Sequence, residues 1–195
     1  EDQDAVRILS IDAGQQVGQI AVGSRPSSVI ATSASTGIVT NGTSGDIMFL
    51  DVAGRRVTAT LKVGKDPRAV AMHPSRMFAY VALGGDNAVA IVDLQGTPRV
   101  VGTVAVGKNP VAVAFSADGT RAVVANVSSN TLSVFDSSNA AAPRLVANVA
   151  VGAQPTAVAF GLPSPDSVYV GNLGANYLTV VDVGRPKAQM VQGVI

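Results

Sequence analysis

The chain has 195 residues with 14 basic and 13 acidic side chains, so its formal net charge of +1 supplies no field to hold a nucleic-acid backbone. It contains no cysteine, which excludes disulfides, thiolate catalysis and thiolate-bound zinc or iron–sulfur clusters. Hydrophobic residues make up 47% and aromatic residues 4%, and no apolar run approaches the roughly 18 residues of a membrane span, so the composition predicts a strand-rich domain that does not cross a membrane.

A short pattern, V-G-x-x-P, recurs four times along the chain. Its prolines are Pro26, Pro67, Pro110 and Pro155. Aspartates that close short apolar runs keep nearly the same spacing: Asp12, Asp51, Asp93, Asp136 and Asp182. Because the prolines and the aspartates recur with nearly the same spacing, they predict an internal repeat of roughly 40 to 45 residues. Within a single domain, 1–195, we expect a half unit at 1–23 and fuller units at 24–64, 65–107, 108–152 and 153–195.

Four short β-type runs fit into each unit, most clearly at 111–115, 121–126, 131–136 and 143–151. The segments Ser116–Gly119 and Val127–Asn130 between them carry turn residues, because Asp and Asn bond their own backbone and Gly accepts positive φ. No segment shows the apolar stripe of a helix. The aspartate that ends each third run is expected to cap the following turn, since a catalytic group would not be needed once per repeat.

Four antiparallel strands in such a period are typical of a β-propeller blade. Neighbouring residues such as Val134 and Phe135 are both apolar, so both faces of each sheet must be covered by other sheets. The sequence therefore predicts an all-β fold, a β-propeller of four-stranded antiparallel blades. About four and a half blades are visible, and the repeat arithmetic predicts that they are part of a larger, seven-bladed ring of about 300 residues.

The second runs end in a further motif. Its copies read IVTN at 38–41, YVAL at 80–83, VVAN at 123–126 and YVGN at 169–172. Together with Asn130–Asp136 and the V-G-x-x-P segments, they resemble the YVTN-type β-propeller repeat, whose members include surface-layer-like and lactonase-like propellers, cell-surface binding proteins and propellers attached to redox enzymes. The resemblance covers nearly the whole chain. It implies a periplasmic, extracellular or cell-surface location more than it implies a reaction.

The loops that enter the first strands are predicted to open on one face around the axis, together with the loops that join second to third strands. Because the V-G-x-x-P frame repeats while its x positions vary, Val, Gly and Pro would serve the backbone and the x residues would be free for recognition. The residues predicted to bind a ligand or partner are Arg25, Lys65, Asp66, Lys108, Asn109 and Gln154. The alternative interpretation is a solvated rim.

Groups that could catalyse a reaction are sparse. His73 is the only histidine and is expected at the surface of the opposite face, and Glu1 is the only glutamate. No nucleotide-binding, serine-hydrolase or zinc-protease motif occurs. We therefore expect no catalytic residue, no metal site and no cofactor.

The preferred function is a non-catalytic binding or scaffold propeller outside the cytoplasm, which holds a protein, a glycan or a small ligand on its loop face. The alternative is a propeller enzyme, either a lactonase-like hydrolase or a subunit of a redox enzyme, with its catalytic residues in blades that this chain does not cover. No nucleic-acid partner is expected. Valine-rich sheet edges at both ends predict association through those edges.

Overall fold

A computed structural model describes residues 4–161, 166–184 and 191–194 of the chain. Every regular element in these residues is a β-strand, and the described part holds no helix long and apolar enough to cross a bilayer. The strands form one two-stranded sheet and four four-stranded sheets, all antiparallel. The predicted fold class is therefore confirmed.

Each sheet is built from consecutive strands. A half blade consists of β1 (Ala5–Ser10) and β2 (Gln15–Ala21). Blade 1 consists of β3 (Pro26–Ala31), β4 (Thr36–Asn41), β5 (Asp46–Asp51) and β6 (Arg56–Lys62). Blade 2 consists of β7 (Pro67–Met72), β8 (Phe78–Leu83), β9 (Ala88–Asp93) and β10 (Arg99–Ala105). Blade 3 consists of β11 (Pro110–Phe115), β12 (Arg121–Asn126), β13 (Thr131–Asp136) and β14 (Arg144–Ala150), and blade 4 of β15 (Pro155–Phe160), β16 (Ser167–Asn172), β17 (Leu178–Asp182) and β18 (Val191–Val194).

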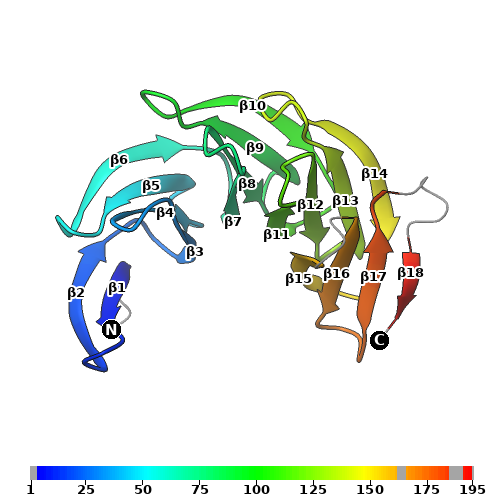
Figure 1. Ribbon diagram of the computed structural model, residues 1–195, viewed down its shortest axis with the longest axis horizontal. Helices are drawn as coiled ribbons and strands as arrows, with labels where there is room; N and C mark the ends of the chain where they lie inside the picture. Colours follow the sequence, from blue (N-terminus) through cyan, green and yellow to red (C-terminus); the bar gives the residue numbers. More distant parts are fainter. Residues whose placement is uncertain (1–3, 162–165, 185–190, 195) are drawn as a thin grey trace.

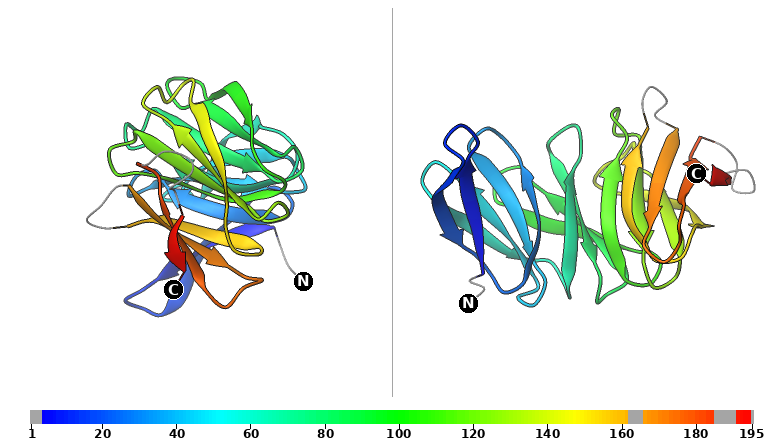
Figure 2. Two further views of the ribbon diagram at one scale, coloured as in Figure 1. Left: turned by 90° about the vertical axis from the view of Figure 1, so that its right-hand side faces the viewer. Right: turned by 90° about the horizontal axis from the view of Figure 1, so that it is seen from below.

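The blades follow one another in chain order around an open arc (Figure 1). Their first strands, β3, β7, β11 and β15, lie on the inside of the arc and contact one another, while β6, β10 and β14 lie on the outside. Seen from below, the sheets stand side by side along the arc (Figure 2). This arrangement brings all loops that precede a first strand to the same end of their sheets.

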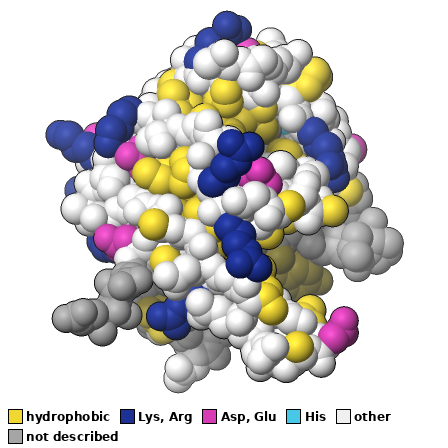
Figure 3. Space-filling view, turned by 90° about the vertical axis from the view of Figure 1, so that its left-hand side faces the viewer, with side chains coloured by type: hydrophobic (Ala, Val, Ile, Leu, Met, Phe, Trp, Pro, Cys, Tyr) yellow, Lys and Arg dark blue, Asp and Glu magenta, His cyan; other side chains and the backbone are white. Residues whose placement is uncertain are grey.

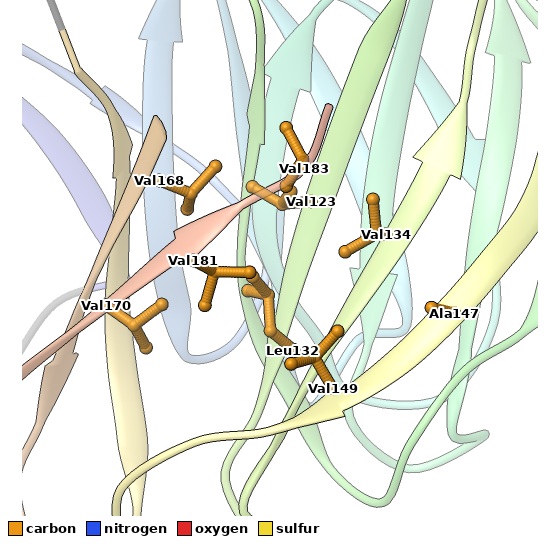
Figure 4. Close-up of a cluster of buried hydrophobic side chains, with 9 residues drawn as sticks. All are labelled: Val123, Leu132, Val134, Ala147, Val149, Val168, Val170, Val181 and Val183. Atoms are coloured by element: carbon orange, nitrogen blue, oxygen red, sulfur yellow. The ribbon is translucent and has the colours of Figure 1, made fainter. Parts of the chain in front are cut away.

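Buried side chains hold the blades together in four clusters, one between each pair of neighbouring sheets. We call each interface a seam and name it by its two blades. In seam 3–4, Leu132 of blade 3 packs in one cluster with Val170 and Val181 of blade 4 (Figure 4). Successive residues of β8 serve different seams, because Val81 belongs to the cluster of seam 1–2 and Tyr80 to that of seam 2–3. The blade therefore buries both of its faces, and each fully buried valine or leucine contributes about 1.5–3 kcal/mol relative to an exposed one.

The aspartates that end the third strands cap the turns that follow, as predicted. Oδ1 of Asp51 accepts the backbone N–H of Gly54 at 2.8 Å, and Oδ1 of Asp93 accepts that of Gln95 at 2.9 Å. Asp51 and Asp93 also form ion pairs with Arg56 and Arg99, the residues that open the fourth strands of their blades. The sequence pattern does not predict these pairs. In the half blade the prediction for Asp12 is wrong, because β1 ends at Ser10 and the Ser10 hydroxyl accepts the N–H of Ala13 at 3.2 Å.

Candidate functional site

Two sets of loops form what we call the loop face: the V-G-x-x-P segments and the turns between second and third strands. In blade 1 the backbone N–H groups of Gly42 and Thr43 donate to the carbonyls of Arg25 and Ser24 at 2.8 and 3.1 Å. The same pair of bonds recurs in blades 2, 3 and 4, at 2.8 to 3.1 Å. The loops that the sequence analysis placed on one face are thus bonded to each other in every blade.

In blades 1, 3 and 4, the glycine of V-G-x-x-P and the asparagine that ends the second strand form one interlocking unit, whereas in blade 2 Leu83 takes the place of the asparagine. A Cβ placed on Gly107 would lie 2.7 Å from Cγ of Asn126, and one on Gly152 would lie 2.5 Å from Cγ of Asn172. Asn126 Nδ2 donates to the Thr131 carbonyl at 3.2 Å and thereby ties the second strand to the third. The glycine is needed because the carboxamide occupies the space of a side chain. Two motifs that looked independent therefore belong to the same packing contact.

The second x residue of each segment has a left-handed backbone. Its φ is 57° at Arg25, 52° at Asp66, 53° at Asn109 and 52° at Gln154. A side chain of the preceding sheet accepts its N–H in three of the four copies: Asp4 at 2.9 Å for Arg25, Asn87 at 2.9 Å for Asn109 and Asn130 at 2.9 Å for Gln154. These residues therefore help to join the blades, and the expectation that only Val, Gly and Pro serve the backbone is wrong.

The first x residues are held through their backbone but have open side chains. The N–H of Lys65 donates to Asp86 Oδ2 at 2.7 Å, and the N–H of Lys108 donates to Ser129 Oγ at 3.0 Å. Both lysines are exposed, and neither forms an ion pair within the described residues. Gln154 is likewise exposed. These three predicted residues lie on the loop face but are not brought into contact with one another.

Arg25 and Asp66, from neighbouring blades, form an ion pair across the loop face. The second oxygen of Asp66 accepts from Nε of Arg68 at 2.7 Å. Two guanidinium groups thus share one carboxylate, and the cluster keeps a net positive charge. The side chains of Arg25 and Arg68 are 51% and 36% exposed, so donors that Asp66 does not use remain open to solvent.

Arg68 is a functional candidate that sequence reasoning missed. The pairing register shifts between Pro67 and Ala69, so Arg68 is an extra residue in a β-bulge, a device that re-aims a side chain. The corresponding bulge residues of the other blades, Ser27, Val111 and Thr156, carry no charge. The sequence therefore did distinguish Arg68, because it is the one charged residue at a repeat position that is neutral in the other three blades.

Asn109 joins this cluster from blade 3. A Cβ on Gly84 would lie 2.9 Å from Oδ1 of Asn109 and 3.0 Å from Oδ2 of Asp66, so both side chains approach the same glycine. Oδ1 of Asn109 is buried and accepts no hydrogen bond from the described residues. This buried oxygen is an acceptor and cannot bond an incoming carboxylate. Recognition of an acidic partner would therefore rest on the guanidinium donors of Arg25 and Arg68.

On the face in Figure 3, basic side chains are dispersed over the surface, and several have an acidic neighbour. That face therefore carries no large patch of a single charge sign. Among the ion pairs of the described residues, Lys62 pairs with Asp46 at 2.9 Å.

His73 lies in the turn after β7, at the opposite end of the blade from the loop face. Its Nε2 is 3.1 Å from the carbonyl oxygen of Gly119, and its Nδ1 is 3.1 Å from the N–H of Ser75. A carbonyl can only accept, so Nε2 carries the hydrogen and Nδ1 accepts. The ring also packs edge-on against Phe115 at 5.1 Å. His73 is thus half-buried between two blades rather than a free surface histidine.

A family model described as the cytochrome D1 heme domain matches residues 31–160, which is more than half of the chain. No curated protein matches the sequence. The family description implies a heme, whose iron takes His, Cys, Met or Tyr ligands in proteins. The chain has no cysteine, and both ring nitrogens of its only histidine are engaged. The described residues hold no group of three or more His, Cys, Asp or Glu side chains that could bind a metal ion. The described residues therefore offer a heme iron neither a cysteine nor a free histidine, which leaves only methionine and tyrosine as ligand types, and we derive no chemistry through a heme.

Solved structures similar to this chain share its fold at low sequence identity. A functionally unknown protein from Desulfotomaculum acetoxidans DSM 771 has a TM-score of 0.79 and 13% identity, over 98% of this chain and 64% of that one. A putative 6-phosphogluconolactonase from Bacteroides uniformis ATCC 8492 has a TM-score of 0.79 and 12% identity, over 96% and 62%. The hydrazine synthase of Kuenenia stuttgartiensis has a TM-score of 0.67 and 15% identity, over 98% and 80%.

This chain spans less than two thirds of the length of the first two of these structures. At 12–15% identity the three structures show the propeller fold alone, so they do not transfer an activity. The family itself follows from the sequence match together with the blades described above. The chain belongs to the cytochrome D1 heme domain family, a family of β-propellers.

Proposed function

We propose that this chain is a non-catalytic binding or scaffold propeller that recognises an acidic group of a protein, glycan or small ligand on its loop face. The observation that carries the proposal is the cluster of Arg25, Asp66 and Arg68, in which two guanidiniums share one carboxylate and keep partly exposed side chains. An incoming carboxylate can bond the guanidinium donors that Asp66 leaves free. Lys65 and Lys108 stand next to the cluster with exposed side chains and extend its positive charge.

The location outside the cytoplasm and the YVTN repeat type are part of the same proposal. The resemblance is supported by the packing of Asn126 and Asn172 against the V-G-x-x-P glycines, which gives both motifs one physical role. Fractionation of cells that produce the whole natural protein tests the location. Recovery in the cytoplasm would contradict it.

This chain contains no cysteine, so one introduced cysteine is the only labelling site within residues 1–195, and the unsubstituted whole protein, treated in the same way, gives the background. A photo-crosslinker is attached at Lys108→Cys on the loop face or, as the matched control, at Thr97→Cys in the exposed turn between β9 and β10. Both are placed in the whole protein and returned to the natural host. We expect one discrete adduct from position 108 and none from position 97. Adducts of equal yield from both positions, or none from 108, would remove the proposal.

The arginines give the second arm of this experiment. Arg25→Ala together with Arg68→Ala leaves Asp66 without its cationic partners, so the adduct from position 108 should fall at least tenfold. An unchanged yield would show that another part of the loop face makes the contact.

An activity assay distinguishes the proposed binding propeller from the alternative, a propeller enzyme. The similarity to a protein described as a 6-phosphogluconolactonase makes hydrolysis of that lactone the reaction to assay. We expect a rate equal to the spontaneous one for this chain. A faster rate that Arg25→Ala or Asp66→Asn abolishes would favour an enzyme instead.

A further inference from the structure

Seam 1–2 contains a cavity of about 290 Å³ that is partly open to solvent. The turns after β3 and β7 contribute Thr32 and Arg76 to it, so it opens at the end of the blades opposite the loop face. Its walls are mainly apolar, with Ile38 and Phe49 on blade 1 and Met72 and Leu94 on blade 2. The cavity is therefore separate from the site of the proposed function.

The neighbouring seam shows why this space is open. Ile38 pairs with Ile30 and Phe49 across blade 1, just as Tyr80 pairs with Ala71 and Ile91 across blade 2. In seam 2–3 the ring of Tyr80 is fully buried and lies 4.6 Å from that of Phe115, which in turn contacts His73. The counterparts of Tyr80, Phe115 and His73 in seam 1–2 are Ile38, Met72 and Thr32. Three rings are replaced by three smaller side chains.

One cation stands at the mouth of the cavity in a strained conformation. Arg76 has a φ of 60°, whereas the same turn of blade 3 has a glycine, Gly119, with a φ of 75°. A non-glycine residue rarely adopts this backbone, so the arginine is held there against its preference. Its Nη1 donates to the Thr32 carbonyl at 3.1 Å, across the seam. Within the described residues no carboxylate pairs with Arg76, although six other arginines each have an aspartate partner.

The other polar groups of the rim are already engaged. The hydroxyls of Thr32 and Thr36 lie 2.7 Å apart, and that of Thr58 donates to the Phe49 carbonyl at 3.1 Å. The guanidinium of Arg76 is therefore the main source of unused hydrogen-bond donors, and it prefers a carboxylate.

We propose that seam 1–2 binds a small ligand with an apolar body in the cavity and one carboxylate on Arg76. At roughly 30 Å³ for each non-hydrogen atom, the volume per molecule of liquid water, the cavity holds about ten such atoms. A straight-chain carboxylate of about eight carbons has this size, so octanoate is the probe.

The first measurement locates octanoate by methyl NMR of methionine-labelled protein. Met72 lines the cavity, whereas Met77 is an exposed side chain outside it. We expect a saturable shift of the Met72 methyl with one octanoate per chain, little shift of Met77, and much weaker binding of acetate, which lacks the apolar body. Absence of a saturable Met72 shift would overturn the proposal.

Variants that install the residues of the neighbouring seam provide the second measurement. Ile38→Tyr fills the cavity and should weaken octanoate binding more than tenfold, and Met72→Phe, monitored by calorimetry, serves if Ile38→Tyr does not fold. Arg76→Gly should weaken octanoate about tenfold, the value of one charge-assisted hydrogen bond, and leave the binding of octan-1-ol unchanged.

Arg55→Gly is the matched control, because Arg55 also has a left-handed backbone, with a φ of 51°, but does not line the cavity. Arg55→Gly should change neither the affinity for octanoate nor the affinity for octan-1-ol. Octanoate binding that survives filling of the cavity, or an equal loss in Arg55→Gly and Arg76→Gly, would show that the ligand sits elsewhere.

Discussion

Seams 1–2 and 2–3 have the same backbone frame and different fillings. Both are formed between four-stranded sheets that pair in the same register, with the same bulges in their first and fourth strands. Seam 2–3 is filled by rings in tilted and edge-on contact, and the buried hydroxyl of Tyr80 donates to the Ala140 carbonyl at 3.0 Å. Seam 1–2 has Ile38, Met72 and Thr32 at the matching positions and keeps a cavity of about 290 Å³.

The difference separates what the repeat requires from what each blade adds. The frame depends on the aspartate caps, which recur through the four blades, and on the glycine–asparagine contacts of blades 1, 3 and 4. The filling depends on single side chains that differ between copies without disturbing the frame, because a cavity costs stability without changing the strand pairing. A repeat fold can therefore vary one seam at a time.

The largest expected effect comes from emptying the filled seam. Tyr80→Ala removes a fully buried ring and its hydrogen bond to Ala140, and should lower the free energy of unfolding by about 3–5 kcal/mol. Tyr169→Ala is the matched control, because Tyr169 has the same register in blade 4 and its side chain is 40% exposed. Urea unfolding of both variants measures the difference. Equal losses would show that the ring of Tyr80 does not hold the seam.

The frame could be predicted from the sequence because it repeats. The prolines of V-G-x-x-P and the aspartates at the ends of the third strands indicated the repeat period, and the apolar runs within one period indicated four strands. Capping by Asp51 and Asp93 followed from the local chemistry of aspartate in turns. The clustering of loops on one face also followed from strand order alone. These features depend on residues close together in the chain, which a linear pattern records.

The filling and the site could not be predicted in the same way. Hydrophobic patterning treats Ile38 and Tyr80 as equivalent, although one leaves a cavity and the other fills it. The pair of Arg25 with Asp66 joins loops 41 residues apart, and its partner Arg68 is re-aimed by a bulge that no motif marks. The left-handed backbone of these loops could not be predicted either, because the residues that adopt it share only their position in the repeat. They are Arg25, Asp66, Asn109 and Gln154.

The second effect tests the glycine–asparagine contact of blade 3, which forms one side of seam 2–3. Gly107→Ala places a Cβ 2.5 Å from Ser129 Oγ and 2.7 Å from Asn126 Cγ, so overpacking should cost about 1–3 kcal/mol of unfolding free energy. Gly102→Ala is the control, because nothing lies within 4 Å of its Cβ position, and it should be neutral or slightly stabilising. Thermal unfolding of the two variants measures the contrast. A neutral Gly107→Ala would mean that the glycine–asparagine contact is not required.

The third effect distinguishes the two seams by acid sensitivity. In the turn after β11, the Ser116 hydroxyl, with the N–H and hydroxyl of Thr120, holds the pKa of Asp118 below its ordinary value. The matching residue of blade 2 is Ser75, which cannot titrate in this range.

The sign of this effect follows from proton linkage. The unfolded chain binds a proton at higher pH than folded Asp118 does, so the stabilisation is complete above the unfolded pKa and is lost as pH falls through the folded one. Asp118→Asn should make stability less dependent on pH between about 5 and 2. Ser116→Ala, which removes the hydroxyl that donates to Asp118 at 2.6 Å, should change this dependence in the same direction but less. An unchanged pH dependence in both variants would refute the role of the turn.

The smallest effect concerns the ion pairs at the outer turns, which belong to the frame of both seams. Asp93 is 8% exposed where it meets Arg99 at 2.8 Å, and Asp51 is 25% exposed where it meets Arg56 at 3.2 Å. Both arginines are largely exposed, so solvent screens each pair and neither substitution to alanine should cost more than about 1 kcal/mol. Because Asp93 is less hydrated, loss of Arg99 leaves a carboxylate that water compensates poorly, and Arg99→Ala should cost more than Arg56→Ala. Chemical unfolding at low and at high salt measures both. A larger cost for Arg56→Ala would mean that burial of the carboxylate does not set the strength of these pairs.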